Sequence, residues 1–280
     1  MQTFIEILKA IFIGIVQGIT EWLPVSSTGH MIIANEFVSL KVSDGCWSLF
    51  EVITQLGSIL AVVILFFDKL NPFSKNKSAV MKKQTWTLWL KVVVAVLPAA
   101  IIGLIFEDWL DKTFYKFIPV SIALIAYGIL FIVIERINKN RKMRYESVYD
   151  IDYLTAIKIG CFQVLSLIPG TSRSGSTILG ASTVGVSRTA AAEFSFFLAI
   201  PVMLGASALK VVKFIFDGLT LNAVEIAVLV AGTLTAFAVS LAVIKFLMAF
   251  VKRHSFESFG WYRIALGIIL ILYYLIKNSI

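Results

Sequence analysis

Apolar runs of about the length that a helix needs to cross a bilayer, roughly 17 to 25 residues, recur along this chain. We expect six transmembrane helices from these runs. They cover 48–67, 86–106, 117–134, 190–209, 223–245 and 261–276.

Two further apolar segments, 4–37 and 153–186, are interrupted in the middle. The first is broken by Pro24 and the run Val25–Gly29, and the second by Pro169–Gly175. Proline removes a backbone donor, and serine and glycine favour turns, so each segment predicts two short helices around a loop. Such a loop is tolerated at membrane depth only where protein covers it or where it lines a wet cavity. We therefore expect two re-entrant helix-loop-helix hairpins.

Composition supports an all-α polytopic membrane protein. The 280 residues are 59% apolar and 15% charged, with a mean hydropathy of +0.89, whereas soluble domains are about 25% charged. The opening MQTFIEILKA lacks the features of a removable signal peptide. The net charge of +8 comes from loops beside apolar runs, which excludes nucleic acid as the expected partner. Cys46 and Cys161 are isolated and have no metal-ligand spacing.

Loop charges predict the orientation of the chain. Basic residues crowd 68–91 and 135–152, which the positive-inside rule places in the cytoplasm. The segment 107–116, with Glu107, Asp108 and Asp111, then lies outside. Counting spans from these loops places both termini outside. The basic residues are Lys69, Lys75, Lys77, Lys82, Lys83 and Lys91 in the first loop and Arg136, Lys139, Arg141, Lys142 and Arg144 in the second.

This topology makes the chain, 1–280, a single membrane domain with an inverted-topology repeat. Repeat one covers about 1–135 and repeat two about 153–280, and each is a broken hairpin followed by three spans. Seven residues recur at a constant offset of 146. They are Ala10, Ile11, Ile13, Gly14, Gln17, Ser26 and Gly29, which match Ala156, Ile157, Ile159, Gly160, Gln163, Ser172 and Gly175.

The polar residues capable of chemistry gather in the two hairpin loops, which such folds bring together near the membrane midplane. A guanidinium at membrane depth is costly unless an anion or a wet cavity compensates it, so Arg173 marks function. The alternative is a structural ion pair with Glu21 or Glu193. Around Arg173, the hydroxyls, glycines and backbone N–H groups of the PGTSRSGST run suit a phosphate. The expected phosphate-binding residues are Ser26, Thr28, Gly170, Ser172, Ser174 and Thr177.

Glu21 and Gln17 share one helix face, at i and i+4. A carboxylate beside an anion site repels its ligand unless a cation lies between them, which predicts Mg²⁺ or Ca²⁺ held by Glu21, Gln17 and the phosphates. The alternative is again a simple ion pair between Glu21 and Arg173. His30 follows the hydroxyl-rich loop and is either structural or the base that activates Ser27.

QGITEWLPVSSTGH and PGTSRSGST together resemble the motifs of the undecaprenyl pyrophosphate phosphatase family of the bacitracin-resistance type. The resemblance covers essentially the whole chain. It implies an enzyme of the bacterial inner membrane that hydrolyses the polyprenyl diphosphate carrier for cell-wall synthesis at its outer face, with a divalent cation. It also implies catalytic roles for Glu21, Ser27, His30 and Arg173. Gln17 departs from the glutamate of many members, and its amide can ligate a cation but cannot act as a base.

The sequence leaves open an alternative function and the identity of the attacking group. Inverted repeats with broken helices are also typical of transporters, so a carrier of a phosphorylated polyprenyl lipid is the alternative function. The attacking group is Ser27, His30 or water. The element from Ser27 to His30 resembles part of another phosphatase superfamily, but His254 is the only other histidine and its surroundings do not fit that motif. A homodimer fits the family.

Overall fold

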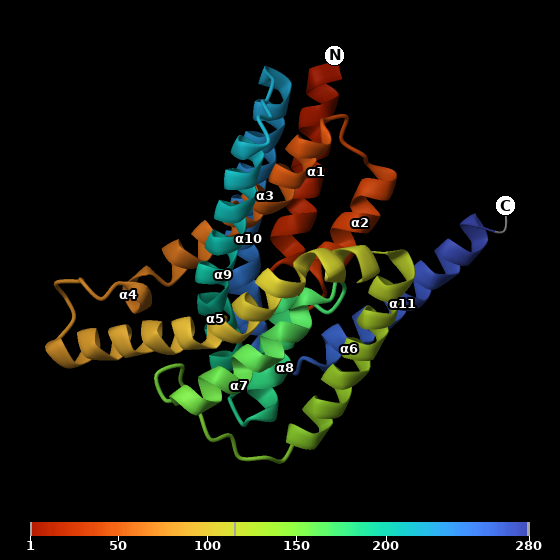
Figure 1. Ribbon diagram of the computed structural model, residues 1–280. Helices are drawn as coiled ribbons and strands as arrows, with labels where there is room; N and C mark the ends of the chain where they lie inside the picture. The colour runs from red at the N-terminus through yellow and green to blue at the C-terminus, as the bar shows by residue number, and fades with distance from the viewer. Residues whose placement is uncertain (1, 115, 279–280) are drawn as a thin grey trace.

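In this computed structural model, residues 2–114 and 116–278 are described, and the regular elements among them are helices (Figure 1). The first half contains α1 (Gln2–Thr20), α2 (Ser27–Phe37), α3 (Asp44–Leu65), α4 (Phe67–Leu70), α5 (Ala79–Phe114) and α6 (Phe117–Asn138). The second half contains α7 (Tyr153–Val164), the 3-10 turn η1 (Leu165–Leu167), α8 (Arg173–Thr183), α9 (Arg188–Phe216), α10 (Ala223–Val251) and α11 (Glu257–Lys277).

Helices are confirmed at all six places where the sequence predicts a span, as α3, α5, α6, α9, α10 and α11. The breaks at 21–26 and 168–172 are confirmed as well. Among the described residues, seven helices are long and apolar enough to cross a membrane, and the seventh is α1. By length and composition α1 is thus also a candidate span, and its place as one arm of a re-entrant hairpin stays a prediction.

Helix α5 is longer than the run from which it was predicted. It begins at Ala79 rather than 86 and continues through 106, so the end of the expected cytoplasmic loop and most of the expected outer loop are helical. Ser78 starts the helix by accepting hydrogen bonds from the backbone N–H of Met81 (3.3 Å) and Lys82 (3.0 Å). Lysine, methionine and glutamine are good helix formers, which explains the early start.

The outer position of 107–116 is predicted from its acidic residues, and the structure does not describe their side chains. The side chains of Glu107, Asp108, Asp111 and Lys112 lie outside the described residues, as do Tyr115 and the last two residues of the chain. The orientation therefore stays a prediction.

The first helix of each half packs on the other half. α1 lies along α10, and α7 lies along α5. α3 packs on α9, and α6 packs on α11 as a pair that stands apart at one side of the bundle (Figure 1). The two halves are therefore interleaved rather than placed side by side.

Glycines allow the interleaved helices to approach closely. A Cβ on Gly14 of α1 would lie 2.6 Å from the carbonyl oxygen of Gly232 in α10. At the matching position of the second half, a Cβ on Gly160 of α7 would lie 2.2 Å from the carbonyl oxygen of Ala95 in α5. Small residues that bring backbones together are typical of helix interfaces in membranes.

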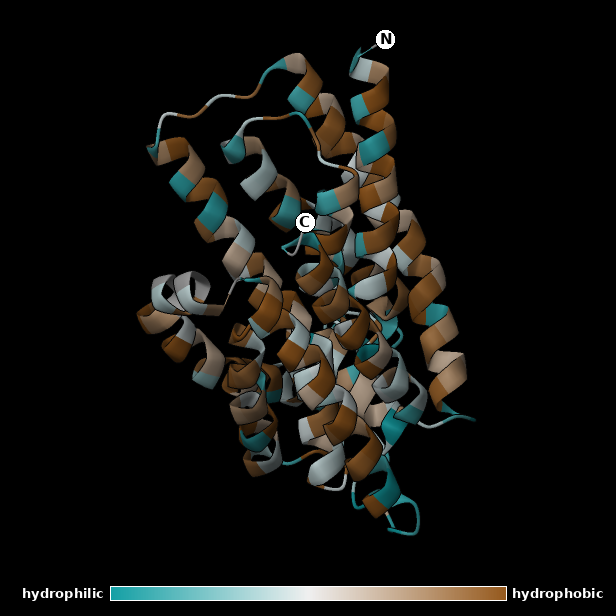
Figure 2. Cartoon of the chain, turned by 90° about the vertical axis from the view of Figure 1, so that its right-hand side faces the viewer, coloured by the Kyte–Doolittle hydropathy of each residue, from teal (hydrophilic) through white to brown (hydrophobic). Residues whose placement is uncertain are grey.

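Large apolar side chains cover the outer surface of the bundle. Leu104, Ile137 and Phe216 are 70%, 69% and 86% exposed. In Figure 2 the helices are mostly brown along their lengths, and teal gathers at loops and helix ends. A soluble protein rarely exposes so much contiguous apolar surface. The chain is therefore a multi-pass membrane protein.

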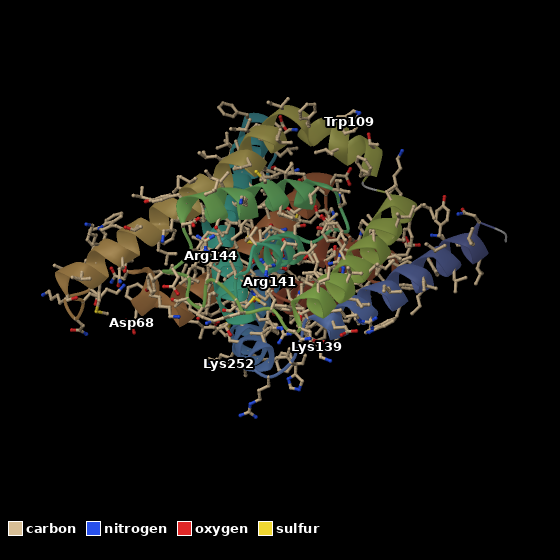
Figure 3. All side chains as sticks on the ribbon, turned by 90° about the horizontal axis from the view of Figure 1, so that it is seen from below. Asp68, Trp109, Lys139, Arg141, Arg144 and Lys252 are labelled. Atoms are coloured by element: carbon tan, nitrogen blue, oxygen red, sulfur yellow. The ribbon has the colours of Figure 1, made fainter. Side chains whose placement is uncertain are left out.

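One end of the molecule carries many of the loop basic residues. The 139–152 segment lies at the lower end in Figure 1, opposite the N-terminus. Figure 3 views that end from below, where Lys139, Arg141, Arg144 and Lys252 lie near one another. This clustering agrees with the charge pattern from which a cytoplasmic face was predicted.

Candidate functional site

Both helix breaks end in the same local structure. Ser26 caps α2 with a φ of 74°, and Ser172 caps α8 with a φ of 73°. The Ser26 hydroxyl accepts from the N–H of Gly29 at 3.2 Å, and the Ser172 hydroxyl accepts from the N–H of Gly175 at 3.1 Å. Positive φ is uncommon outside glycine and clusters at functional sites. These two serines are the only described residues other than glycine with positive φ, and they stand at the offset of 146.

The two loops meet, as the sequence predicts. The Ser174 hydroxyl from the second loop lies 3.3 Å from the carbonyl oxygens of Glu21 and Leu23 in the first. Arg173 Nη2 donates to Glu21 Oε1 at 2.9 Å, and the two side chains are only 11% and 4% exposed. Residues about 150 positions apart therefore form one buried polar cluster.

Glu21 is the centre of this cluster. Its Oε2 accepts from Gln17 Nε2 at 3.0 Å and from the Ser27 hydroxyl at 2.9 Å, while its Oε1 accepts from Arg173. The ion pair that the sequence left as an alternative is thus present. Glu193, the other possible partner of Arg173, instead pairs with Lys69 at 2.8 Å.

Arg173 has further polar neighbours. Its Nη1 donates to the carbonyl oxygen of Ser195 at 2.9 Å, and the Ser195 hydroxyl lies 2.7 Å from that of Thr177. Arg173 Nε and Trp22 Nε1 are buried donors without a partner among the described residues. The Trp22 ring lies 5.6 Å from the guanidinium carbon and packs edge-on against Phe196. Buried donors without partners are unusual, so the cluster has the capacity to bind an anion.

The remaining phosphate-binding candidates lie in the two loops or in the first turns of the helices that follow them. The hydroxyls of Ser172 and Ser174 lie 3.1 Å apart, and the Thr177 hydroxyl donates to the carbonyl oxygen of Arg173 at 3.0 Å. Gly170 has a φ of 96°, which favours glycine, and is buried beside the loop. Thr28 is half-buried in the first turn of α2. All six candidates therefore lie in or next to the two loops.

His30 does not hydrogen-bond to Ser27. Its Nδ1 lies 2.7 Å from the carbonyl oxygen of Ser26, and its Nε2 lies 2.6 Å from the Tyr262 hydroxyl. The Ser27 hydroxyl donates to Glu21 instead. In this arrangement Glu21 is the group placed to accept the proton of Ser27, and the role of His30 as a base stays a prediction.

Sequence reasoning missed three residues of this site. Ser195, Tyr262 and Arg263 lie inside apolar helices and reach the loops only through the tertiary structure. The sequence does contain a signal for Arg263. An arginine inside the apolar run 261–276 has the same unfavourable free energy at membrane depth as Arg173, and such residues usually mark function. The other two give no signal in the sequence.

The expected divalent cation has few ligands here. The described residues bring together no group of three or more His, Cys, Asp or Glu side chains that could hold a metal. Glu21 offers one carboxylate, and among the described side chains Gln17 is the only amide bound to it. This set fits a hard cation such as Mg²⁺, which is often held by one or two carboxylates together with substrate phosphates, and does not fit a cage made of protein ligands alone.

Known proteins are similar to this chain over nearly its whole length. The family model described as "Bacitracin resistance protein BacA" matches residues 10–269. A protein of Enterococcus faecalis named undecaprenyl-diphosphatase is 57% identical, with 96% of this chain and 97% of that protein covered. Undecaprenyl-diphosphatase 1 of Clostridium acetobutylicum is 55% identical (97% and 98% covered), and undecaprenyl-diphosphatase of Streptococcus agalactiae is 52% identical (98% of each). On this match, and with the two motif loops joined in one buried site, the chain belongs to the bacitracin resistance protein BacA family.

Proposed function

We propose that this chain is a membrane phosphatase that hydrolyses undecaprenyl diphosphate to undecaprenyl phosphate and inorganic phosphate. The reaction recycles the lipid carrier of cell-wall synthesis and confers resistance to bacitracin. The relatives named above support this activity, because they match nearly the full chain at 52–57% identity. The structural observation that carries the proposal is the contact of Glu21 with both Ser27 and Arg173 across the two loops.

The site suits phosphoryl transfer. Arg173, with its unpartnered Nε, and the hydroxyls around it bind the terminal phosphate and neutralise charge there, which is where most catalysis of phosphoryl transfer arises. Glu21, which accepts the hydrogen bond of Ser27, or His30, which the sequence predicts as the base, takes the proton of Ser27 as the serine oxygen attacks phosphorus. The bond to the bridging oxygen breaks, and undecaprenyl phosphate leaves. Water then releases inorganic phosphate from Ser27. Attack by water or by His30 is the alternative, and the variants below distinguish these routes.

Glu21 and Gln17 would hold the divalent cation. When bound, the cation supplies positive charge between this carboxylate and the diphosphate. Its binding is measured by titrating Mg²⁺ or Ca²⁺ into the phosphate-release assay with wild type and Glu21→Gln, and the variant should need more cation or fail to respond.

We further propose that α1 with α2 and α7 with α8 form two re-entrant hairpins in an inverted repeat, with α3, α5, α6, α9, α10 and α11 crossing the membrane. The paired contacts of α1 with α10 and of α7 with α5 support this symmetry. So do the matched caps at Ser26 and Ser172. The site would open to the outer face of the bacterial inner membrane, with both termini outside.

Phosphate release in detergent tests the activity. Purified protein with undecaprenyl diphosphate and Mg²⁺ should release phosphate, and Ser27→Ala and Glu21→Gln should each lower the rate by about 10²-fold or more. His30→Ala should also lower phosphate release by about 10²-fold or more if His30 is the base or the nucleophile. His254→Ala is its matched control, because His254 is exposed and is the only other histidine of the sequence. No phosphate release by folded wild type would refute the proposal. Full activity of Ser27→Ala would exclude serine as the nucleophile.

The orientation is tested separately by cysteine labelling in intact cells. Lys41→Cys and Lys75→Cys place single thiols at exposed positions of opposite predicted sides. The exposed Cys161 is first replaced by serine, whereas Cys46 is buried. An impermeant reagent should label position 41 only. Labelling of position 75 alone would reverse the orientation.

Transport of a phosphorylated polyprenyl lipid is not favoured, because the relatives carry the name of a phosphatase. Release of phosphate in detergent, where no membrane sides exist, separates hydrolysis from transport. A homodimer stays a prediction, which the mass of the purified protein in detergent checks.

A further inference from the structure

Helix α11 reaches the site through two adjacent residues that the mechanism above does not use. Arg263 is fully buried, with 0% of its surface exposed, and Tyr262 is 46% exposed. Both project from the part of α11 that packs on α6, where a Cβ on Gly260 would lie 2.7 Å from the carbonyl oxygen of Gly128. This close approach fixes the position of Tyr262 and Arg263 relative to the core.

Arg263 binds the backbones of both loops. Its Nη1 donates to the carbonyl oxygen of Pro24 at 3.0 Å. Its Nη2 donates to the carbonyl oxygens of Gly170 at 2.8 Å and Thr171 at 3.0 Å. The planar guanidinium, with its fork of donors, is suited to several acceptors at once. The three acceptors immediately precede the segments capped by Ser26 and Ser172.

The charge of Arg263 is compensated by groups other than a carboxylate. Its hydrogen-bond partners are backbone carbonyls, and its guanidinium carbon lies 5.4 Å from the centre of the Tyr127 ring. Carbonyl dipoles and an aromatic face stabilise a buried cation. An arginine buried in this way only to fill space would be costly, which favours a role in holding the loops.

Tyr262 determines the surroundings of His30. A carbonyl oxygen can only accept, so His30 Nδ1 donates to Ser26 and, in the neutral ring, Nε2 accepts from the Tyr262 hydroxyl at 2.6 Å. The two rings are stacked, with centroids 5.7 Å apart and planes 4° apart. Ser26 and Tyr262 together fix both the tautomer and the ring plane of His30.

We propose that Tyr262 and Arg263 are positioning residues of the phosphatase site. Arg263 holds the two loops in register, so that Glu21 and Ser27 of one loop face Arg173 of the other. Tyr262 holds the His30 ring with Nε2 unprotonated. This proposal rests on the proposed function for its kinetic test, and its spectroscopic test is independent of activity.

The kinetic test compares Arg263→Lys and Tyr262→Phe with matched controls. Lysine keeps the charge of Arg263 but cannot bridge three carbonyls, so kcat should fall on the order of 10²-fold through misplacement of the reacting groups. Tyr262→Phe keeps the stacked ring and should lower kcat about tenfold, with KM within about twofold of wild type. The exposed Arg253→Lys and Tyr274→Phe should behave as wild type. Wild-type kcat in Arg263→Lys would overturn the role of Arg263.

The spectroscopic test uses the two histidines of the chain. Protein labelled with ¹⁵N-histidine gives two pairs of ring-nitrogen signals, one pair for each histidine, and His254→Gln assigns the pair of His30. The unprotonated Nε2 of His30 should move towards the resonance of an imidazole without a hydrogen bond in Tyr262→Phe, and should stay unchanged in Tyr274→Phe. An unchanged Nε2 resonance together with wild-type kcat in Tyr262→Phe would overturn the role of Tyr262.

The two tests can show that the positioning role is wrong independently of whether the protein is a phosphatase. If wild type released no phosphate, the proposed function would fail while the ¹⁵N resonances still tested the contact with His30. If Arg263→Lys failed to fold, Tyr262→Phe would still decide the proposal, because Tyr262 lies at the surface of α11 and phenylalanine retains its packing.

Discussion

The ion pair between Glu21 and Arg173 should contribute to stability and to catalysis in ways that one set of variants can separate. In Arg173→Met, the Glu21 carboxylate keeps its neutral donors Gln17 and Ser27 but loses the cationic partner that it has within the described part of the chain. The carboxylate is 4% exposed, so water cannot replace the lost charge. Removing one partner of a buried ion pair costs about 3–5 kcal/mol.

That free energy converts to a measurable shift in Tm. At about 2–4 °C per kcal/mol for a chain of 150–250 residues, the expected loss is about 6–20 °C for Arg173→Met. The double variant Glu21→Gln with Arg173→Met removes both charges, so it should recover most of the lost stability. All of these variants should lose activity, because none presents a guanidinium to the phosphate.

The assay is thermal unfolding of the purified protein in detergent, with phosphate release measured on the same samples. Arg136→Met is the matched control, because Arg136 pairs with Glu257 at 2.9 Å but is 64% exposed. Its loss should be at most about 1 kcal/mol. A double variant no more stable than Arg173→Met would refute the account of the buried pair. Recovered activity in the double variant would refute the phosphate role of Arg173.

Three further predictions concern other parts of the chain. Gly160→Val should lower Tm sharply, because even a Cβ would lie 2.2 Å from the carbonyl oxygen of Ala95. Ser26→Ala should lose about 1 kcal/mol through loss of the cap, and Ser26→Gly less, because glycine relieves the positive φ; Tm measures both. Hydrogen bonds, first that from Tyr145, lower the pKa of Asp152 from 3.8 to about 2. Its stabilisation is therefore complete above pH 4 and lost as the pH falls towards 2, and the Tm difference between wild type and Asp152→Asn should shrink over that range.

Specific outcomes would contradict each of these predictions. A Gly160→Val variant as stable as wild type would mean that α5 and α7 separate easily. Equal Tm values for Ser26→Ala and wild type would mean that the hydroxyl contributes nothing as a cap. A Tm difference for Asp152→Asn that is independent of pH would assign its effect to shape rather than to charge. Asparagine remains a good cap for α7, so the comparison isolates the charge.

Much of the fold was readable because its signals are local. Uninterrupted apolar runs give the long helices, and Pro24 and Pro169 mark the two breaks. Helix ends were less readable, since Ser78 and the residues that follow it extend α5 beyond its apolar run. The contact between the two loops followed from the internal offset of 146, because related halves bring equivalent residues together.

The other contacts of the site could not be predicted from the sequence, because the residues that make them come together only when the helices pack. The Tyr262 hydroxyl reaches His30 across 232 positions of sequence, and the neighbouring Arg263 marks that part of the chain without indicating that Tyr262 contacts His30. Ser195 lies in a helix whose surroundings are apolar, and it contacts Arg173 mainly through its carbonyl oxygen. The preference of Ser27 for Glu21 over His30 depends on side-chain directions, which a linear pattern does not contain.

The interleaving of the two halves also constrains how the protein is made. α1 is synthesised early, but the helix on which it packs, α10, begins only at Ala223. α1 therefore stays in the bilayer without this partner until most of the chain has been synthesised. α7 in turn needs α5, which is already in place when α7 emerges. The first helix of each half makes its most extensive contact with a helix of the other half. A gene cut within 139–152 should therefore yield functional protein only when both fragments are produced in the same cell.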